Sequence, residues 1–259
     1  MKKLLIILII LTLACSVFAE DIGLLRKSLI MSTLWQTTSA EYHALAYQAY
    51  NIARLRLDED LKIKRTKKRA IVVDADETVI DNSAFQVRMI VDGVQYSSDF
   101  DNWVKSAEGK AIPGSLDFLN YAYENGCNIY YISNRKLHHM EGTLKNLKIL
   151  GFPQAEKSHI LLKSNTSNKG IRRDQVAEDH FIVMFIGDNL IDFEDVFRYN
   201  NIEERYSSVE KFKDEFGKKF IILPNPMYGE WEKTLYGGTR KISVKEKEKK
   251  MWGHLNNNK

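Results

Sequence analysis

The segment Val72-Val73-Asp74-Ala75-Asp76-Glu77-Thr78 sets the architecture of the chain. It continues from Ala70 and Ile71, so a short apolar run bounded by charged residues ends in two closely spaced aspartates. Such runs are typical of strands that are buried on both faces of a parallel sheet. We therefore predict a buried strand over residues 70–73, with the carboxyl groups of Asp74 and Asp76 at its carboxyl end.

A second acidic stretch, Gly187-Asp188-Asn189-Leu190-Ile191-Asp192, follows the apolar run of residues 181–186 in the same way. Because the carboxyl ends of parallel strands lie at one edge of the sheet, we expect the aspartates of both stretches to share a crevice. Carboxylates this close repel unless a cation shares their charge, and oxygen donors without nearby histidine or cysteine favour Mg²⁺ over Zn²⁺. The alternative is that each aspartate forms a turn or caps a helix.

The rest of the chain alternates strand and helix patterns. Further short apolar runs lie at residues 129–132, 159–162 and 220–223, and helical patterns lie at 114–124, 139–150 and 167–177. This order predicts an α/β fold, a Rossmann-like parallel sheet flanked by helices. Residues 82–112 break the alternation, which indicates an inserted cap. We expect a smaller, mainly helical cap built from this insertion and the N-terminal helices.

Composition divides the chain into four segments. Residues 1–19 are predicted to be a signal peptide, because Lys2 and Lys3 precede an apolar run that is too short to span a membrane. Residues 20–66 form an N-terminal helical segment, in which Thr38-Ser39-Ala40-Glu41 has the spacing of a capping box. Residues 67–226 make the α/β core, and residues 227–259 form a C-terminal segment with a basic tail.

The N-terminal signal leaves two routes open. Either the chain is cleaved after Ala19, or Cys15 is lipidated and attaches the protein to a membrane. Both routes predict an exported protein, periplasmic or membrane-anchored and facing away from the cytoplasm. Cys127 is the other cysteine, so the mature chain cannot form an intramolecular disulfide; its position at a strand start is typical of a small buried apolar group.

The charge distribution bears on the partners. The chain has 259 residues, of which 44% are hydrophobic and 28% charged, and this composition excludes a disordered chain or a multispan membrane protein. Its net charge of +4 comes from its ends, because the last 20 residues carry seven basic and two acidic side chains. Without that tail and Lys2 and Lys3, the body is acidic. The sequence therefore does not support binding to a nucleic acid polymer.

The two aspartate stretches resemble the signature of the class C, nonspecific acid phosphatases of the haloacid dehalogenase (HAD) superfamily, many of which are bacterial lipoproteins. Supporting matches lie at residues 40–50, Ser133-Asn134-Arg135-Lys136, Ser167-Asn168-Lys169 and Asn225-Pro226-Met227-Tyr228-Gly229. Ala75, Ile80 and Phe85 depart from the family pattern, at positions that concern packing or substrate contact. The resemblance implies an acid phosphatase that hydrolyses phosphomonoesters, including nucleoside 5′-monophosphates, with Mg²⁺.

The resemblance also implies roles for individual residues. Asp74 would attack phosphorus to form an aspartyl-phosphate, and Asp76 would be the general acid and base, holding a proton favoured by acidic pH and neighbouring carboxylates. Mg²⁺ would be bound by the Asp74 carboxylate, the Asp76 main-chain carbonyl and the Asp188 carboxylate, and Asp192 would complete the metal site by orienting water bound to the ion. Phosphate would be bound by Ser133, Asn134 and Lys169, although Ser133 equally fits a helix cap and Lys169 a surface charge.

Three aromatic residues match positions that contact the leaving group in similar proteins: Phe85, Trp103 and Tyr228. Core packing is the competing interpretation for each ring. Two other functions stay open, a non-catalytic surface binding or storage protein on the same fold, and a phosphotransferase with an acceptor other than water.

Overall fold

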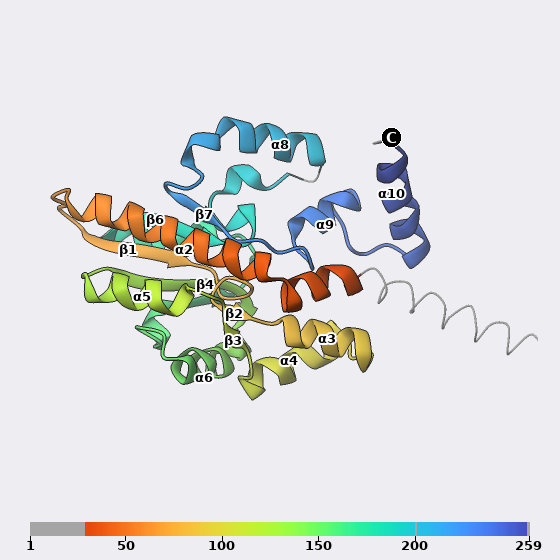
Figure 1. The fold of residues 1–259 in the computed structure, drawn as a ribbon, viewed down its shortest axis with the longest axis horizontal. Coiled ribbons are helices and arrows are strands. Elements are labelled where there is room, and N and C mark those ends of the chain that lie inside the picture. The colour runs from red at the N-terminus through yellow and green to blue at the C-terminus, as the bar shows by residue number, and fades with distance from the viewer. Residues whose placement is uncertain (1–28, 200, 258–259) are drawn as a thin grey trace, which may run out of the picture.

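The computed structural model describes residues 29–199 and 201–257 (Figure 1). Its centre is a five-stranded sheet in the order β5-β4-β1-β6-β7, in which all neighbouring strands are parallel. The strands are β1 (Lys68–Val73), β4 (Asn128–Lys136), β5 (Ile160–Lys163), β6 (His180–Gly187) and β7 (Phe220–Ile222). The prediction of a parallel sheet flanked by helices is confirmed, and β1 occupies the middle of the sheet.

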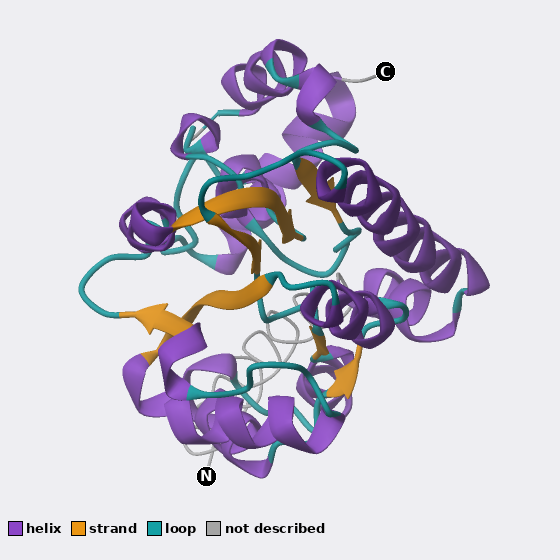
Figure 2. Ribbon diagram, turned by 90° about the vertical axis from the view of Figure 1, so that its left-hand side faces the viewer, coloured by secondary structure: helices purple, strands orange, loops and turns teal. Residues whose placement is uncertain are grey.

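Helices cover both faces of the sheet (Figure 2). On one face, α2 (Ala40–Leu61), α5 (Ser115–Glu124) and α6 (Met140–Leu150) pack over a large apolar cluster that includes Ile71, Ile129 and Ile186. On the other face, α7 (Gly170–Asp179) and α8 (Ile202–Lys211) pack over a second cluster rich in phenylalanine. Both clusters fix β1 and β6, the strands that lead into the two acidic stretches.

Helix α2 lies on the sheet, and this corrects the expectation that the N-terminal helices belong to the cap. Ala46, Ala53 and Leu57 are fully buried along one side of α2, and the helix packs against α5, β6 and β7. Small side chains at this spacing let a helix approach its neighbours closely. The N-terminal residues 29–38 are also helical and precede α2.

The insertion after β1 forms a compact helical unit. A two-stranded antiparallel ribbon, β2 (Ile80–Asp81) and β3 (Lys110–Ala111), leads into and out of α3 (Ser83–Val91) and α4 (Tyr96–Ser106). Its core holds Phe85, Phe100, Trp103 and Val104. Helix α4 packs closely on α6, and Gly142 in α6 permits this approach. A Cβ atom at Gly142 would lie 2.5 Å from the Val104 carbonyl oxygen.

The chain continues beyond β7 into α9 (Glu230–Leu235) and α10 (Val244–Asn257). Short 3₁₀ helices complete the described fold: η1 (Leu137–His139), η2 (Lys157–His159), η3 (Leu190–Asp192), η4 (Asp195–Phe197) and η5 (Lys213–Glu215). Within the described ranges, every helix is too short or too polar to cross a membrane. The predicted signal peptide and Cys15 lie outside the described residues, whereas Cys127 is buried immediately before β4.

Candidate active site

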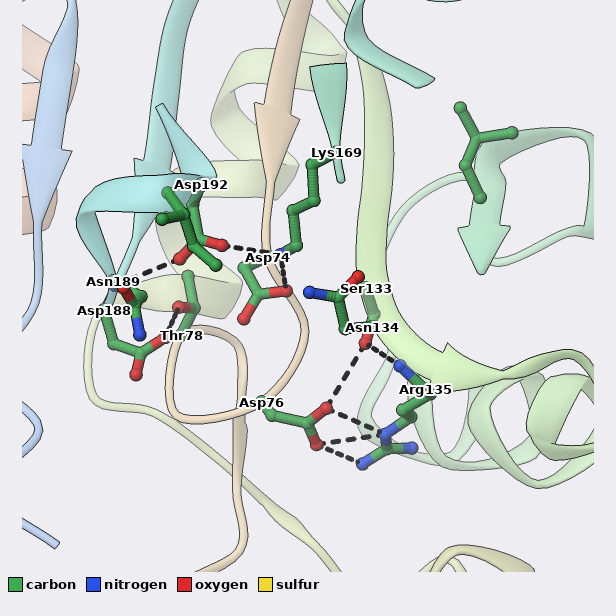
Figure 3. A network of polar contacts seen from close by, with 12 residues as sticks. Asp74, Asp76, Thr78, Ser133, Asn134, Arg135, Lys169, Asp188, Asn189 and Asp192 are labelled. Atoms are coloured by element: carbon green, nitrogen blue, oxygen red, sulfur yellow. Dashed lines mark hydrogen bonds and ion pairs between the residues drawn. The ribbon is translucent and has the colours of Figure 1, made fainter. Parts of the chain in front are cut away.

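The two acidic stretches meet at the carboxyl ends of β1 and β6 (Figure 3). Val73 pairs with Ile186, and the Asp74 amide donates a hydrogen bond to the Ile186 carbonyl at 2.9 Å. One carboxylate oxygen from each of Asp74, Asp188 and Asp192 lies within 4.8 Å of the others. The parallel pairing of the two strands therefore brings Asp74 together with two carboxylates that lie more than 100 residues further along the sequence.

Gly187 makes room for Asp192 in this cluster. A Cβ atom at Gly187 would lie 2.5 Å from Asp192 Oδ2, and this distance is too short for any side chain at position 187. The same Oδ2 accepts a hydrogen bond from the Asn189 amide at 3.0 Å, which holds the Asp192 carboxylate back over the end of β6. The Gly-Asp sequence at the end of the strand is thus needed for the close approach.

Lys169 is the cation of the cluster. It precedes α7, its side chain is 3% exposed, and its Nζ donates to Asp74 Oδ1 and lies 2.7 Å from Asp192 Oδ1. Burial alone would lower the pKa of Lys169, but the charges of Asp192 and Asp74 outweigh it and raise the pKa. The lysine therefore stays positively charged between two carboxylates, which excludes the interpretation of Lys169 as a solvated surface charge.

The carboxylates hold more negative charge than Lys169 can balance. Burial, with the nearby charges of Asp192 and Asp76, raises the pKa of Asp74 to about 7 against the lowering effect of Lys169. Burial and the charges of Asp192 and Asp74 raise the pKa of Asp188 well above its usual range. A divalent cation would relieve this repulsion, and three carboxylates without histidine or sulfur ligands suit a hard ion such as Mg²⁺. The residues therefore fit the predicted metal.

Asp76 faces away from this cluster, toward Arg135 at the end of β4 (Figure 3). Arg135 Nη2 donates to Asp76 Oδ1 at 2.8 Å, and Asn82 Nδ2 donates to the same oxygen at 2.8 Å. Burial would raise the pKa of Asp76, but the charge and hydrogen bonds of Arg135 lower it below its usual range. This corrects the expectation that crowding by carboxylates favours a proton on Asp76, because a buried guanidinium is the dominant neighbour.

Ser133 and Asn134 lie beside Asp74 and above Asp76 in Figure 3. The Ser133 hydroxyl donates to Asp76 Oδ2 at 3.3 Å and accepts from the Arg135 amide at 3.0 Å, so it does not cap a regular helix. Asn134 Oδ1 accepts from Arg172 at 2.8 Å, which leaves the Asn134 amide group directed toward Asp74 (Figure 3). The Asn134 side-chain amide can therefore donate to an anion beside Asp74, and the Ser133 hydroxyl can do so if it turns its single proton away from Asp76.

A pocket of about 290 Å³ opens onto Asp74 and Asn134, and its aromatic wall differs from the expected one. Tyr228 lines the pocket together with Tyr96 and Phe100. Phe85 and Trp103 instead lie in the core of the cap, 1% and 4% exposed, and the Trp103 indole donates to Asn82 Oδ1 at 2.7 Å. The physical reason is that the cap needs large apolar side chains of its own to fold.

Sequence reasoning missed Arg135 and the buried pair Glu77 and Asn82. The main-chain amide of Asn82 donates to Glu77 Oε1 at 2.9 Å. The side chain of Asn82 forms hydrogen bonds with Glu77, Asp76 and Trp103. Burial, with the charge of Asp76, raises the pKa of Glu77 well above its usual range. Glu77 lies within the acidic stretch that follows β1, and Asn82 lies shortly after it. Their closeness to Asp74 and Asp76 in sequence is the signal that could have identified them.

A larger hollow of about 780 Å³ lies elsewhere, beside α2, α7 and the start of β6. Its lining includes Arg56, Asp60 and Phe181, and it contains none of the four predicted aspartates. Its size alone gives no chemistry, because none of the predicted phosphate-binding or metal-binding side chains lines it. We therefore take the smaller pocket as the candidate active site.

Comparison with known proteins gives a consistent result. The family model described as HAD superfamily, subfamily IIIB (acid phosphatase), matches residues 26–231. The crystal structure of a class C acid phosphatase from Bacillus anthracis with tungstate bound superposes with a TM-score of 0.86 at 46% identity, covering 88% of this chain and 97% of that one. A second structure of the class C acid phosphatase from Bacillus anthracis gives a TM-score of 0.85 at 45% identity, with the same coverage of both chains.

Curated plant proteins are more distant relatives. A stem 31 kDa glycoprotein from Glycine max is 26% identical over 160 residues, 59% of this chain, and acid phosphatase 1 from Solanum lycopersicum is 26% identical over 167 residues, 61% of this chain. The matched regions span 56% and 57% of those two proteins. The likeness therefore concerns little more than half of each plant protein, whereas it covers nearly the whole of the bacterial structures.

Proposed function

The chain belongs to the acid phosphatases of HAD subfamily IIIB, and on that premise we propose that it is an exported, Mg²⁺-dependent acid phosphatase. Its substrates are phosphomonoesters, including nucleoside 5′-monophosphates, and the reaction passes through an aspartyl-phosphate. The observation that carries the proposal is the buried carboxylate of Asp74, held by Lys169 in the same pocket as Asp188 and Asp192. A nucleophile, a phosphate-binding cation and a metal-binding set are thereby combined in one place.

Asp74 is the nucleophile in this proposal. Its carboxylate oxygen forms a bond to phosphorus as the bond between phosphorus and the leaving oxygen breaks, and water then cleaves the aspartyl-phosphate. Lys169, Ser133 and the Asn134 amide donate to the phosphoryl oxygens and stabilise the charge that develops on them. The raised pKa of Lys169 supports this role, because the lysine keeps its charge throughout the acidic and neutral range.

Asp76 is the general acid and base. It donates a proton to the leaving oxygen and later accepts one from the attacking water, which contributes about 10²–10⁴-fold to the rate. Because Arg135 lowers the pKa of Asp76, the fraction that carries this proton grows only as the pH falls. This supports an acidic working range for the first step.

Asp74, Asp188 and Asp192, with the main-chain carbonyl of Asp76, would hold the Mg²⁺ ion. When bound, the ion would neutralise negative charge on the carboxylates and on the phosphoryl oxygens. Asn225 supports Asp188, since its Nδ2 donates to Asp188 Oδ2 at 2.8 Å and fixes the direction of that carboxylate. Positioning of a metal ligand by a neighbouring side chain is a recurrent feature of such sites.

Hydrolysis of p-nitrophenyl phosphate and AMP, measured from about pH 4 to 8 with and without EDTA, tests the proposal. We expect activity that EDTA abolishes and MgCl₂ restores, and a loss of about 10⁴-fold in Asp74→Asn. Asp117→Asn, on the exposed side of α5, is the matched control and should retain full activity. Metal-independent hydrolysis, or an active Asp74→Asn, would reject the scheme.

Two other outcomes separate the alternatives. A wild-type protein that hydrolyses no phosphomonoester would favour a non-catalytic binding protein on this fold. Appearance of a phosphorylated product when an alcohol or nucleoside is added would favour phosphotransfer over hydrolysis. Mass spectrometry of the mature N-terminus tests export, because cleavage after Ala19 and lipidation of Cys15 leave different first residues and different masses.

A further inference from the structure

The pocket is lined by five lysine and arginine side chains, and one of them has no anionic partner among the described residues. Ion pairs within 4.0 Å join four of them to carboxylates: Arg135 to Asp76, Lys136 to Asp101, Lys169 to Asp74 and Asp192, and Arg240 to Glu230 and Glu232. The fifth, Lys163, is half-buried and has no carboxylate within that distance in the described part of the chain. Its charge is therefore left to a ligand or to solvent.

Lys163 also lies next to a second lysine. Strands β4 and β5 pair in parallel through Ser133 and Leu162, the register then shifts, and Lys136 pairs with Lys163 where both strands end. Positions paired across neighbouring strands are about 5 Å apart. Like charges at such positions repel each other. This pairing sets two lysines side by side at the edge of the pocket.

The nearest anion does little to balance this pair. Asp101 lies 3.8 Å from Lys136 Nζ, but its two carboxylate oxygens are already bonded by His138 at 3.1 Å and His139 at 2.7 Å. The Lys136 and Asp101 side chains are about half exposed, so their attraction is weak. A positive edge therefore faces the pocket on the side of β4 and β5, beyond the groups that bind the transferred phosphate.

We propose that Lys136 and Lys163 bind a second anionic group, a phosphate or a carboxylate, carried by the leaving group of the phosphomonoester. This inference rests on the proposed phosphatase function and adds a substrate class to it. A substrate with two separated anionic groups places one beside Asp74 and Lys169 and the other against the lysine pair. The pair binds by charge and needs no particular sugar or base, so bisphosphates and phosphorylated carboxylic acids share this subsite.

Two matched substrate pairs test the proposal. Adenosine 3′,5′-bisphosphate is compared with AMP, and 3-phosphoglycerate with glycerol 3-phosphate, so that each pair differs in the second anionic group. In Lys163→Gln, the ratio of kcat/KM for the substrate that carries the second anionic group to that for its partner should fall about tenfold for at least one pair. A fall in the first pair alone identifies phosphate as the preferred group, and a fall in the second alone identifies carboxylate.

Two control variants make the test specific. Lys163→Arg keeps the charge and should keep the ratio, whereas Lys145→Gln removes an exposed lysine from α6, outside the pocket lining, and should leave the ratio unchanged. If Lys163→Gln lowers kcat/KM equally for both members of each pair, the second-anion subsite is rejected while the phosphatase function stands. If wild-type protein hydrolyses neither AMP nor glycerol 3-phosphate, the proposed function itself fails.

Discussion

Arg135 lies directly against Asp76, with Nη2 2.8 Å and Nε 3.0 Å from Asp76 Oδ1. The arginine side chain is 1% exposed and also donates to Thr143 at 3.0 Å, so its position is fixed from two sides. A charge-assisted pair of this kind both orients the carboxylate and lowers its pKa. Arg135 is therefore a positioning residue for the proposed general acid, and it determines the pH at which that acid carries a proton.

Arg135→Gln should change the pH dependence of catalysis. Loss of the guanidinium raises the pKa of Asp76, so the protonated form persists to higher pH. The alkaline limb of the pH profile of kcat/KM therefore shifts to higher pH. The maximum rate should fall about tenfold, because the carboxylate is less well oriented. Arg135→Lys keeps the charge without the forked geometry, and its alkaline limb should stay closer to that of wild type. An unchanged profile in Arg135→Gln would contradict this role.

The sequence made the carboxylates predictable but not their partners. Asp74 and Asp188 follow apolar runs that are typical of buried strands, and strand pairing then dictates where they meet. Arg135 gave no such signal, because an arginine in a strand is ordinarily expected at the surface and its burial depends on an acid 59 residues away. The positions of the Phe85 and Trp103 rings were ambiguous for a different reason. Cap packing and substrate contact both use large aromatic side chains, so the residue type does not distinguish them.

Gly187→Ala should disable the site while leaving most of the fold intact. The added methyl group would meet Asp192 Oδ2 at 2.5 Å and displace a carboxylate that Lys169 also binds. A displacement of about 1 Å at such a site can cost about 10²-fold in rate, which steady-state assays would detect. Gly253→Ala in α10 is the control, because its methyl group meets open space. Equal activities in the two variants would show that Asp192 tolerates the shift.

Trp103→Phe distinguishes packing in the cap from contact with substrate. The substitution keeps an aromatic ring at this position but removes the indole hydrogen bond to Asn82 Oδ1 at 2.7 Å. This loss should lower the free energy of unfolding by about 1–2 kcal/mol. Because Trp103 does not line the pocket, KM for AMP should stay within about twofold of the wild-type value. Denaturant titration and steady-state kinetics measure the two quantities. A large rise in KM with unchanged stability would instead place the Trp103 ring against the leaving group.

Asp60→Asn should remove a pH-dependent contribution to stability far from the active site. Asp60 lies in the last turn of α2 and forms ion pairs with Arg65 and Arg69. The Arg69 Nε atom lies 2.7 Å from Asp60 Oδ2. Burial would raise the pKa of Asp60, but its hydrogen bonds to Arg65 and Arg69 outweigh it and lower the pKa. A carboxylate whose pKa is lower in the folded than in the unfolded state stabilises the fold above the unfolded value, and that contribution disappears as the pH falls through the folded value.

The expected loss in Asp60→Asn is therefore about 2–3 kcal/mol at neutral pH, and the difference from wild type should narrow below about pH 4. Urea unfolding at a series of pH values measures it. Glu59→Gln is the matched control, because the neighbouring carboxylate is 59% exposed in its pair with Arg56, and its loss should cost less than about 1 kcal/mol at every pH. A difference between Asp60→Asn and wild type that stays constant down to acidic pH would show that the ionised carboxylate does not supply this stability.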